Sequence, residues 1–305
     1  MEIPARLQAV IGRMLPMLRS LLHGDRGLAI FHGTNDPLSA ECTAILAADP
    51  IGGRPLSHAV HSAFARLAHE STVVICDVGG PLAFEFSDGG YRIVVNCGAP
   101  VSGNVRLMAV SSLPEAHSTA VLTRADASPR PSWRFFENFR FASRSVPAST
   151  AEVGSSDIGS MIDASHNAYE HPTGFVNQRR LFLSAAGDDF RGEDSFLSTR
   201  FGAGAAETVF AIRFHLHPTV KATLARDGGN VVLLLPNGSG WKFSARGAVI
   251  RLEESICLWG RAGPRKTTQI LLTGTVDGAV NWAFKRVRNH PVTAERGDEE
   301  TGLLL

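Results

Sequence analysis

The sequence predicts an all-β protein: a large antiparallel multi-sheet β-sandwich with a short α-helical N-terminal segment. Three observations support this fold class. The apolar pattern changes from a helical period to a two-residue period near residue 72. The chain is then divided into short β-branched or aromatic runs separated by Gly and Asp. Hairpin-type turns, Asp227-Gly228-Gly229 and Asn237-Gly238, separate some of these runs. Such a meander folds as a sandwich or a barrel.

The first 50 residues differ from the rest of the chain. Apolar residues recur at helical spacing over residues 5–22, and Gly24 ends that pattern as a helix C-terminal glycine would. Residues 37–48 predict a second short helix, with Asp36 as its N-cap and a proline at its first position. Two helices alone bury little apolar surface. Residues 1–50 therefore look like the tail of a helical domain.

The strands are predicted from runs such as TVVICDV, LAFEFSDG, YRIVVNCG, RRLFLSA and TVFAIRFHLH. Residues 57–70 fit a helix or a strand by periodicity alone. Residues 125–160 are expected to form a long connecting segment around an aromatic patch, Trp133 to Phe141. The aromatic side chains of this patch either stack on sugar rings or pack internally. We therefore expect a sandwich domain over residues 51–286 and a polar tail over residues 287–305.

The charge balance excludes some classes of partner. The 305 residues contain 30 Lys and Arg against 29 Asp and Glu, a net charge of +1. A nearly neutral chain has no global field to gather nucleic acid or an anionic membrane, so neither partner is expected. An acidic polysaccharide is not excluded, because a basic cleft can exist within a neutral total.

The cysteines and the N-terminal sequence indicate in which cellular compartment the protein is expected. The four cysteines lie far apart, and Cys76, Cys97 and Cys257 sit in apolar runs, which favours buried free thiols. Neither a secretory signal nor the roughly 20 apolar residues of a membrane span is visible. We expect a soluble cytoplasmic protein, or a periplasmic one if the N-terminus is truncated. No P-loop, dinucleotide fingerprint or Ser-His-Asp motif occurs.

The second half of the chain carries the segments by which a family can be recognised. They are RRLFLSAAGDDFRGEDSF (179–196), FAIRFHLHPTV (210–220), VVLLLPNGSGWKF (231–243), LEESICLWG (252–260), TTQILLTG (267–274) and NWAFKR (281–286). In this order and spacing they resemble the C-terminal β domain of heparinase II/III family proteins, especially the alphaproteobacterial group. LPMLRSLLHGDRGLAIFHG (15–33) is similar to the end of the helical toroid of that family.

The resemblance implies a two-part protein, in which a helical toroid packs on a β-sandwich and substrate lies between them. It implies a polysaccharide lyase that performs β-elimination on a uronic acid-containing glycan. Such a reaction needs a group that neutralises the sugar carboxylate beside a Tyr/His acid–base pair. Most of the toroid is absent from this chain, which implies a truncated gene product, one half of a split protein with a separate helical toroid partner, or a degenerate relative. The alternative is a non-catalytic carbohydrate-binding or accessory sandwich.

The resemblance also singles out His117 and Asn96. His117, in AHSTAVL, matches the histidine that faces the cleft or a metal in family members, which implies a catalytic role. A strand-end histidine packed against its neighbours is the other interpretation. Asn96 stands where many members have an Asp of a structural zinc site, so only His117 remains of that trio of ligands. A structural zinc is therefore possible but disfavoured, no other cofactor is indicated, and Asn96 is retained as a substrate-binding candidate.

Four further residues are candidates for contact with an acidic glycan. His215 and His217 share one face of a predicted strand, where they bind a metal, contact substrate or serve the structure. Arg179 and Arg213 supply guanidinium groups, which pair bidentately with carboxylates. The alternative for these arginines is a solvated position, or pairing with nearby acidic residues such as Asp194.

Overall fold

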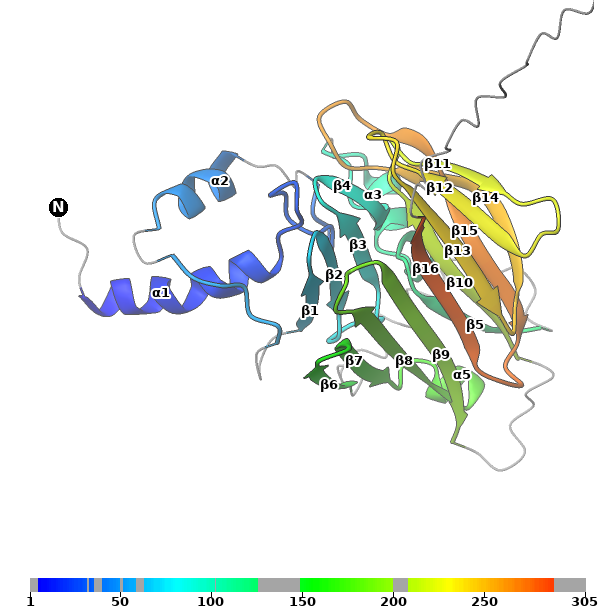
Figure 1. Ribbon diagram of the computed structural model, residues 1–305. Coiled ribbons are helices and arrows are strands. Elements are labelled where there is room, and N and C mark those ends of the chain that lie inside the picture. Colours follow the sequence, from blue (N-terminus) through cyan, green and yellow to red (C-terminus); the bar gives the residue numbers. More distant parts are fainter. Residues whose placement is uncertain are drawn as a thin grey trace, which may run out of the picture.

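Two stacked antiparallel sheets form the body of the protein, and two helices project from one side of it (Figure 1). The computed structural model describes residues 5–31, 33–35, 40–49, 52–58, 63–101, 103–125, 149–199 and 208–287. The prediction of an all-β sandwich with a short helical N-terminal segment is confirmed. The predicted aromatic patch from Trp133 to Phe141 lies outside the described residues.

The first sheet has the strand order β1-β2-β3-β4-β10-β15-β14, and β5 also pairs with β10. Its strands are β1 Phe64–His69, β2 Thr72–Asp77, β3 Phe84–Asp88, β4 Tyr91–Val95, β5 Ala120–Arg124, β10 Thr208–Leu216, β14 Val249–Cys257 and β15 Arg265–Thr275. The segment 57–70, which periodicity alone left undecided, contains strand β1.

The second sheet has the strand order β11-β12-β13-β16-β9-β8-β7-β6. Its strands are β6 Ser149–Ser156, β7 Gly159–His166, β8 Phe175–Ser184, β9 Asp189–Ser198, β11 Lys221–Leu224, β12 Asn230–Leu234, β13 Gly240–Arg246 and β16 Val280–Val287. A single turn of helix, α5 Glu170–Thr173, precedes β8. The predicted hairpin turns at 227–229 and 237–238 join β11 to β12 and β12 to β13.

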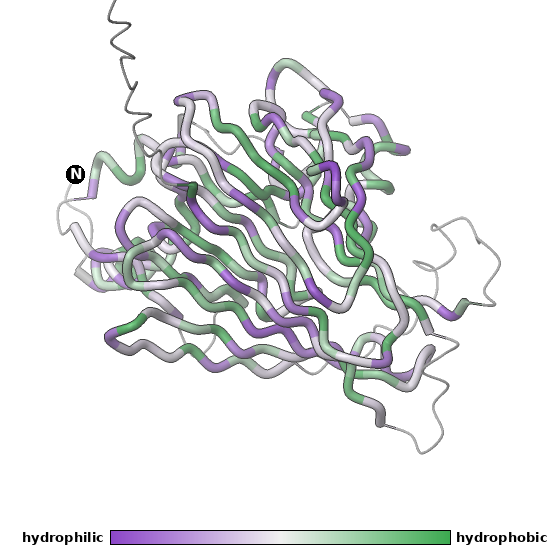
Figure 2. Tube along the Cα trace, turned by 45° about the vertical axis from the view of Figure 1, so that its right-hand side comes forward, coloured by the Kyte–Doolittle hydropathy of each residue, from purple (hydrophilic) through white to green (hydrophobic). Residues whose placement is uncertain are grey.

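The core lies between the two sheets, because each strand turns alternate side chains inward. Apolar and polar residues alternate along the strands accordingly (Figure 2). Aromatic rings fill the centre: Phe84 of the first sheet stacks on Trp282 of the second, with ring centroids 5.4 Å apart. Phe86 meets Trp241 edge to face at 4.9 Å. Burial of such large rings supplies much of the hydrophobic stabilisation.

The helical segment consists of α1 Ala5–Ser20 and α2 Ala40–Ala47, in agreement with the helices predicted there. The prediction that Gly24 ends the first helix is wrong, because that helix ends at Ser20. Gly24 instead lies in a turn that approaches the sheet. A Cβ at this position would lie 1.9 Å from the carbonyl oxygen of Gly89, so only glycine fits.

A buried polar network fixes residues 23–28 to the first sheet. His23 Nε2 lies 3.0 Å from Glu85 Oε2, and its Nδ1 lies 2.8 Å from Ser87 Oγ. Arg92 binds both carboxylate oxygens of Asp25, at 2.8 and 3.1 Å. Since buried charges are tolerated only when they are paired and hydrogen-bonded, this network holds the N-terminal segment in one position.

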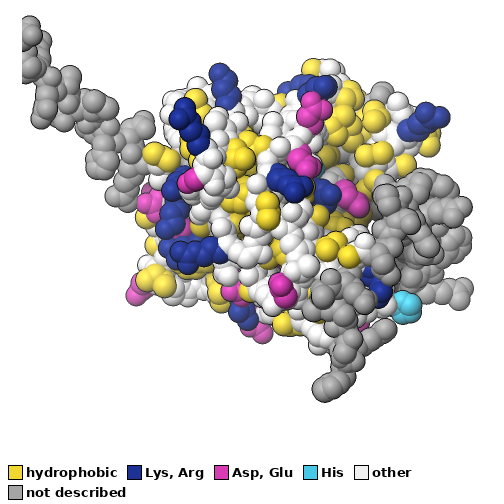
Figure 3. Space-filling view, turned by 90° about the vertical axis from the view of Figure 1, so that its right-hand side faces the viewer, with side chains coloured by type: hydrophobic (Ala, Val, Ile, Leu, Met, Phe, Trp, Pro, Cys, Tyr) yellow, Lys and Arg dark blue, Asp and Glu magenta, His cyan; other side chains and the backbone are white. Residues whose placement is uncertain are grey.

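A third helix, α3 Val105–Ser111, and a 3₁₀ turn, η1 Pro114–Ala116, follow β4 and lie over the outer face of the first sheet. Elsewhere on the surface, basic and acidic side chains are interspersed on the face that Figure 3 presents. None of the helices in the described parts of the chain has the length and apolarity that a membrane span requires.

Candidate functional site

Strand β10 carries the candidates Arg213 and His215. Phe210, Ile212 and Phe214 of this strand enter the core between the sheets. Because side chains alternate along a strand, Arg213 and His215 point to the outer face of the first sheet. The sequence predicted the same alternation for His215 and His217, but β10 ends at Leu216, one residue before His217.

Residues 104–116 cover this part of the outer face. Asn104 caps α3, since its side-chain oxygen accepts hydrogen bonds from the backbone N–H groups of Arg106 and Leu107 at 3.1 and 3.2 Å. Pro114 then starts the 3₁₀ turn that brings the backbone of Glu115 over β10. As a result His215 is only 3% exposed, although it does not face the sandwich core.

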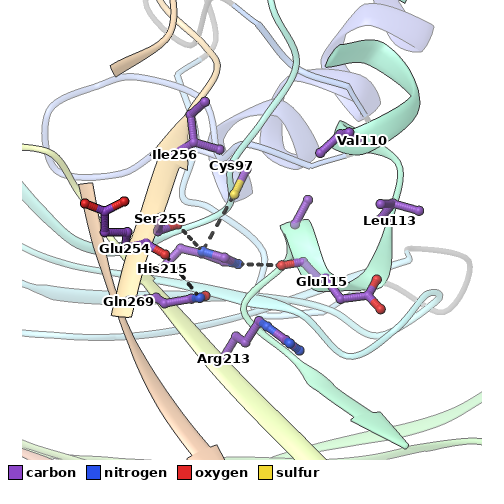
Figure 4. A pocket seen from close by; sticks show the side chains of 11 residues that line it. Cys97, Val110, Leu113, Glu115, Arg213, His215, Glu254, Ser255, Ile256 and Gln269 are labelled. Carbon is purple, nitrogen blue, oxygen red and sulfur yellow. Dashed lines mark hydrogen bonds between the residues drawn. The ribbon is translucent and has the colours of Figure 1, made fainter. Parts of the chain in front are cut away.

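A pocket of about 340 Å³ lies between this cover and strands β10, β14 and β15 (Figure 4). This volume is at the small end of the range for ligand-binding pockets. Its walls are partly apolar and partly polar. They are formed by Cys97, Val110, Leu113, Glu115, Ala116, Arg213, His215, Glu254, Ser255, Ile256 and Gln269.

His215 is held as a neutral imidazole at the base of this pocket. Its Nε2 lies 2.9 Å from the main-chain carbonyl oxygen of Glu115, which can only accept, so Nε2 carries the hydrogen. Its Nδ1 then accepts from the Ser255 hydroxyl at 2.7 Å. Burial lowers the pKa of His215 to about 3, against the weaker opposing effect of the Glu115 carbonyl. Both ring nitrogens are engaged in holding the pocket wall.

Both ring nitrogens of His215 have hydrogen-bond partners. Two other polar atoms of the pocket walls are buried and have no such partner within the described residues. They are Nη1 of Arg213 and Oε1 of Gln269. An unsatisfied buried polar group costs about 1–3 kcal/mol, so such groups are rare in folded proteins. The pocket therefore offers a ligand one charged donor and one neutral acceptor.

His117 lies next to this site rather than in its lining. Its Nδ1 is 2.8 Å from the carbonyl oxygen of Leu113, so Nδ1 carries the hydrogen and Nε2 is the acceptor nitrogen. The ring is half-buried. Its charge, when present, helps to lower the pKa of His215, so the two imidazoles belong to one neighbourhood. The predicted catalytic role of His117 stays a prediction.

Asn96 has a structural role, because its side chain is buried and hydrogen-bonded to the backbone. It is 1% exposed, its Nδ2 donates to the carbonyl oxygen of Ile30 at 2.9 Å, and its Oδ1 accepts from the backbone N–H of Ser118 at 2.8 Å. A contact with substrate does not fit this burial. Asn96 instead joins the N-terminal segment to the sheet, together with Glu85, whose Oε1 accepts its backbone N–H at 3.0 Å.

Arg179 faces the core and is fully buried. Its guanidinium binds both oxygens of Asp194 at 2.7 and 3.0 Å, and its Nη1 donates to the carbonyl oxygens of Leu82 at 2.8 Å and Ser118 at 3.2 Å. A polysaccharide cannot reach it, so the proposed substrate contact does not fit this position. Pairing with Asp194 was the alternative interpretation of the sequence.

His217 lies beyond the end of β10, away from the pocket. Its ring packs on Trp259 with centroids 5.6 Å apart, and its Nδ1 lies 2.7 Å from the Thr219 hydroxyl oxygen. Burial, with the nearby charges of Arg92 and Arg265, lowers the pKa of His217 to about 4. The structure therefore brings Arg213, His215 and His117 together and separates His217 from them.

Zinc does not fit the residues that the family resemblance singled out. Both functional atoms of the Asn96 side chain are used in hydrogen bonds to the backbone, as described above. Across the parts of the chain that the structure describes, no group of three or more His, Cys, Asp or Glu side chains is arranged to hold a metal ion.

Sequence reasoning missed Gln269 and the cover over His215. Gln269 lies in TTQILLTG, where a polar residue beside an apolar run is an ordinary feature of a strand. Its register partners are His215 on β10 and Glu253 on β14. These pairings join residues that are far apart in sequence, so they cannot be predicted from a local sequence pattern.

Comparison with known proteins agrees with this architecture. The family model described as "Heparinase II/III-like, C-terminal" matches residues 51–285. The chain is 33% identical over 263 residues to "FtsZ-localized protein C" of Caulobacter vibrioides, which covers 78% of this chain and 44% of that protein. The Caulobacter relative is consistent with the alphaproteobacterial type of the family.

Two solved structures share the fold. A mutant of the heparan sulfate lyase HepC from Pedobacter heparinus superposes with a TM-score of 0.69 at 12% identity, over 94% of this chain and 48% of that one. A heparinase III, the BT4657 gene product, gives 0.67 at 12% identity, over 93% and 47%. The chain thus spans about half the length of these relatives. By the extent of the family match, it belongs to the heparinase II/III-like family, whose C-terminal domain it carries.

Proposed function

We propose that the pocket beside Arg213 binds an acidic saccharide, and that this chain is the carbohydrate-binding sandwich part of a heparinase II/III-type protein. The observation that carries the proposal is the buried Nη1 of Arg213, which has no partner within the described residues and lies in a pocket with partly apolar walls. Guanidinium binds carboxylate and sulfate through charge-assisted hydrogen bonds, which are stronger when water is excluded.

Binding is favoured over elimination by the state of the groups around the pocket. His215 is neutral with both nitrogens engaged, and burial raises the pKa of the Cys97 thiol to about 12, so neither is poised to remove a proton at neutral pH. Tyr169 is buried, and its hydroxyl donates to the carbonyl oxygen of Ala120. Burial also raises the pKa of Tyr169.

A lyase reaction is the finer proposal, and it would draw on a helical partner. Helix α1 exposes Leu7, Val10 and Met14 at helical spacing, with exposed fractions of 50%, 36% and 64%. Such an apolar stripe is typical of a helix that packs against another element. The solved relatives are about twice as long as this chain. We propose that a helical region covers this stripe and supplies the remaining catalytic groups.

Replacing Arg213 with methionine should weaken binding of a uronate oligosaccharide roughly ten- to hundredfold, the usual effect of losing a hydrogen bond to a charged group. Isothermal titration calorimetry with a panel of uronate oligosaccharides would measure the change. Arg246→Met is the matched control, since Arg246 is exposed on the second sheet. Equal affinities for the wild type and Arg213→Met would contradict the proposed site.

The same samples distinguish binding from lyase activity. Ultraviolet absorbance of the unsaturated uronate product should stay flat for this chain alone. An increase that is lost in His117→Ala would instead establish elimination and a catalytic His117. An increase seen only after a helical half of a longer family member is added would establish the helical partner.

A second candidate function comes from the Caulobacter relative, whose name describes a protein localised by FtsZ. At 33% identity over most of this chain, a shared cellular location is a reasonable inference. We propose that this protein also localises with FtsZ. A fluorescent fusion expressed in Caulobacter vibrioides should overlap with labelled FtsZ and disperse when FtsZ is depleted. A diffuse signal in cells with intact FtsZ assemblies would contradict this proposal.

A further inference from the structure

The pocket presents two unsatisfied atoms of opposite hydrogen-bonding character. Nη1 of Arg213 can only donate, and Oε1 of Gln269 can only accept. Both line one pocket, and Figure 4 shows their side chains below His215. A ligand that satisfies both must therefore carry an acceptor and a donor within the reach of a single small molecule.

The orientation of the Gln269 amide is set by its neighbour on β14. Its Nε2 lies 3.4 Å from the main-chain carbonyl oxygen of Glu254, which can only accept, so the nitrogen faces that carbonyl. Oε1 is thereby the atom left for a ligand. The residue is 8% exposed, so bulk water does not readily solvate this oxygen.

The two carboxylates that line the pocket leave Nη1 of Arg213 without a hydrogen-bond partner in the described part of the chain. Glu254 turns its carboxylate away from the pocket, where its Oε1 lies 3.6 Å from Lys266 Nζ (Figure 4). Glu115 holds His215 through its main-chain carbonyl, and its side chain lines the same pocket as Arg213. Within the described residues, Nη1 of Arg213 has no hydrogen-bond partner among the acidic side chains. The positive charge of Arg213 is therefore available to an anionic ligand.

A simple anion satisfies only half of this arrangement. A carboxylate or a fully ionised sulfate has acceptors for Arg213 but no hydrogen to give to Gln269. A sugar acid has both, because hydroxyl groups stand beside its carboxylate. Its C–H face also suits the apolar side of the pocket, formed by Val110, Leu113 and Ile256. The arrangement thus favours a hydroxy acid over a plain anion.

We propose that Gln269 is a specificity-determining residue that accepts a hydrogen bond from a hydroxyl of the bound sugar acid, and so selects uronate sugars over anions without a donor. This inference rests on the proposed function of the Arg213 pocket. The proposed function concerns recognition of the negative charge of the ligand, and this inference adds recognition of a hydroxyl group next to that charge.

The test compares a sugar acid with a plain carboxylate. The probes are methyl glucuronide, acetate and methyl glucoside, and binding is measured by calorimetry. The wild type should bind methyl glucuronide more tightly than the other two. Gln269→Met keeps the size of the side chain and removes its acceptor. It should weaken binding of methyl glucuronide roughly tenfold and leave binding of acetate unchanged. Gln178→Met, on the second sheet, is the matched control.

The outcomes separate the two proposals. Equal weakening for acetate and methyl glucuronide, or no weakening of either, would overturn the role of Gln269 but leave the Arg213 pocket in place. Loss of folding in Gln269→Met would be detected by circular dichroism, and Gln269→Leu would then serve as the second variant. Failure of the wild type to bind any acidic probe would overturn both proposals.

Discussion

Replacing Asp194 with asparagine should reduce the free energy of unfolding by about 3–5 kcal/mol, because it leaves the guanidinium of Arg179 buried with a weaker partner. The side chains of the pair are 1% and 0% exposed. Asp194 accepts two hydrogen bonds from Arg179 and a third from Trp282 Nε1 at 2.9 Å. The substitution changes little volume, so the loss reports on charge and hydrogen bonding. Urea unfolding followed by circular dichroism would measure it.

A matched exposed pair supplies the control. Arg180 is the sequence neighbour of Arg179 and pairs with Asp163 at 2.9 Å, but the two side chains are 49% and 28% exposed. Asp163→Asn should therefore cost less than about 1 kcal/mol. Similar losses for the two aspartates would contradict a special role for burial.

A double replacement tests the reason for the effect. Changing Arg179 to methionine and Asp194 to leucine removes both charges together. The double variant should be more stable than Asp194→Asn, because no uncompensated charge remains in the core. If it were as unstable as the single variant, packing rather than charge would be the cause.

Much of the fold was predictable because the two-residue period is a local property of each strand. The same two-residue alternation also indicates that Arg179 faces inward. Arg179, Leu181 and Leu183 alternate with more exposed residues along β8, so the arginine shares the face of the two leucines. Its inward position could therefore have been predicted. Its partner Asp194 lies on β9 at the paired register position.

The helical cover and the polar network could not be predicted in this way. His215 is buried by residues about 100 positions earlier in the chain, and His23 meets Glu85 across a separation of 62 residues. These contacts depend on how whole elements pack, which no local window contains. For the same reason Gln269 was missed, although both of its strand neighbours were recognised as family sequence.

Protein stability should decrease steeply as the pH falls from about 6.5 towards 4. His166, His215 and His217 have folded-state pKa values of about 4, 3 and 4, lowered mainly by burial. In the unfolded chain each returns to about 6.5. Above pH 6.5 the three are neutral in both states. Below pH 6.5 the three histidines bind protons in the unfolded chain but stay neutral in the folded protein, so acid favours unfolding.

The size of the effect follows from the number of protons. Each histidine contributes up to about 1.4 kcal/mol per pH unit while it is charged only in the unfolded state, and three contribute about 4 kcal/mol per unit. A typical domain has 5–15 kcal/mol to lose, so two units are enough to unfold many proteins. The unfolding free energy at several pH values would give the slope.

A single substitution should remove the share of that slope that one histidine supplies. His215→Gln keeps a donor and an acceptor but cannot take up a proton, so between pH 6 and 4 the contribution of these three histidines to the slope should fall by about one third. The other two histidines would continue to titrate. A free energy of unfolding that stays level from pH 7 to pH 5 in the wild type would mean that these histidines are protonated in the folded protein. The neutral, fully hydrogen-bonded His215 at the base of the pocket could then not be correct, because a protonated ring has no lone pair to accept the Ser255 hydrogen.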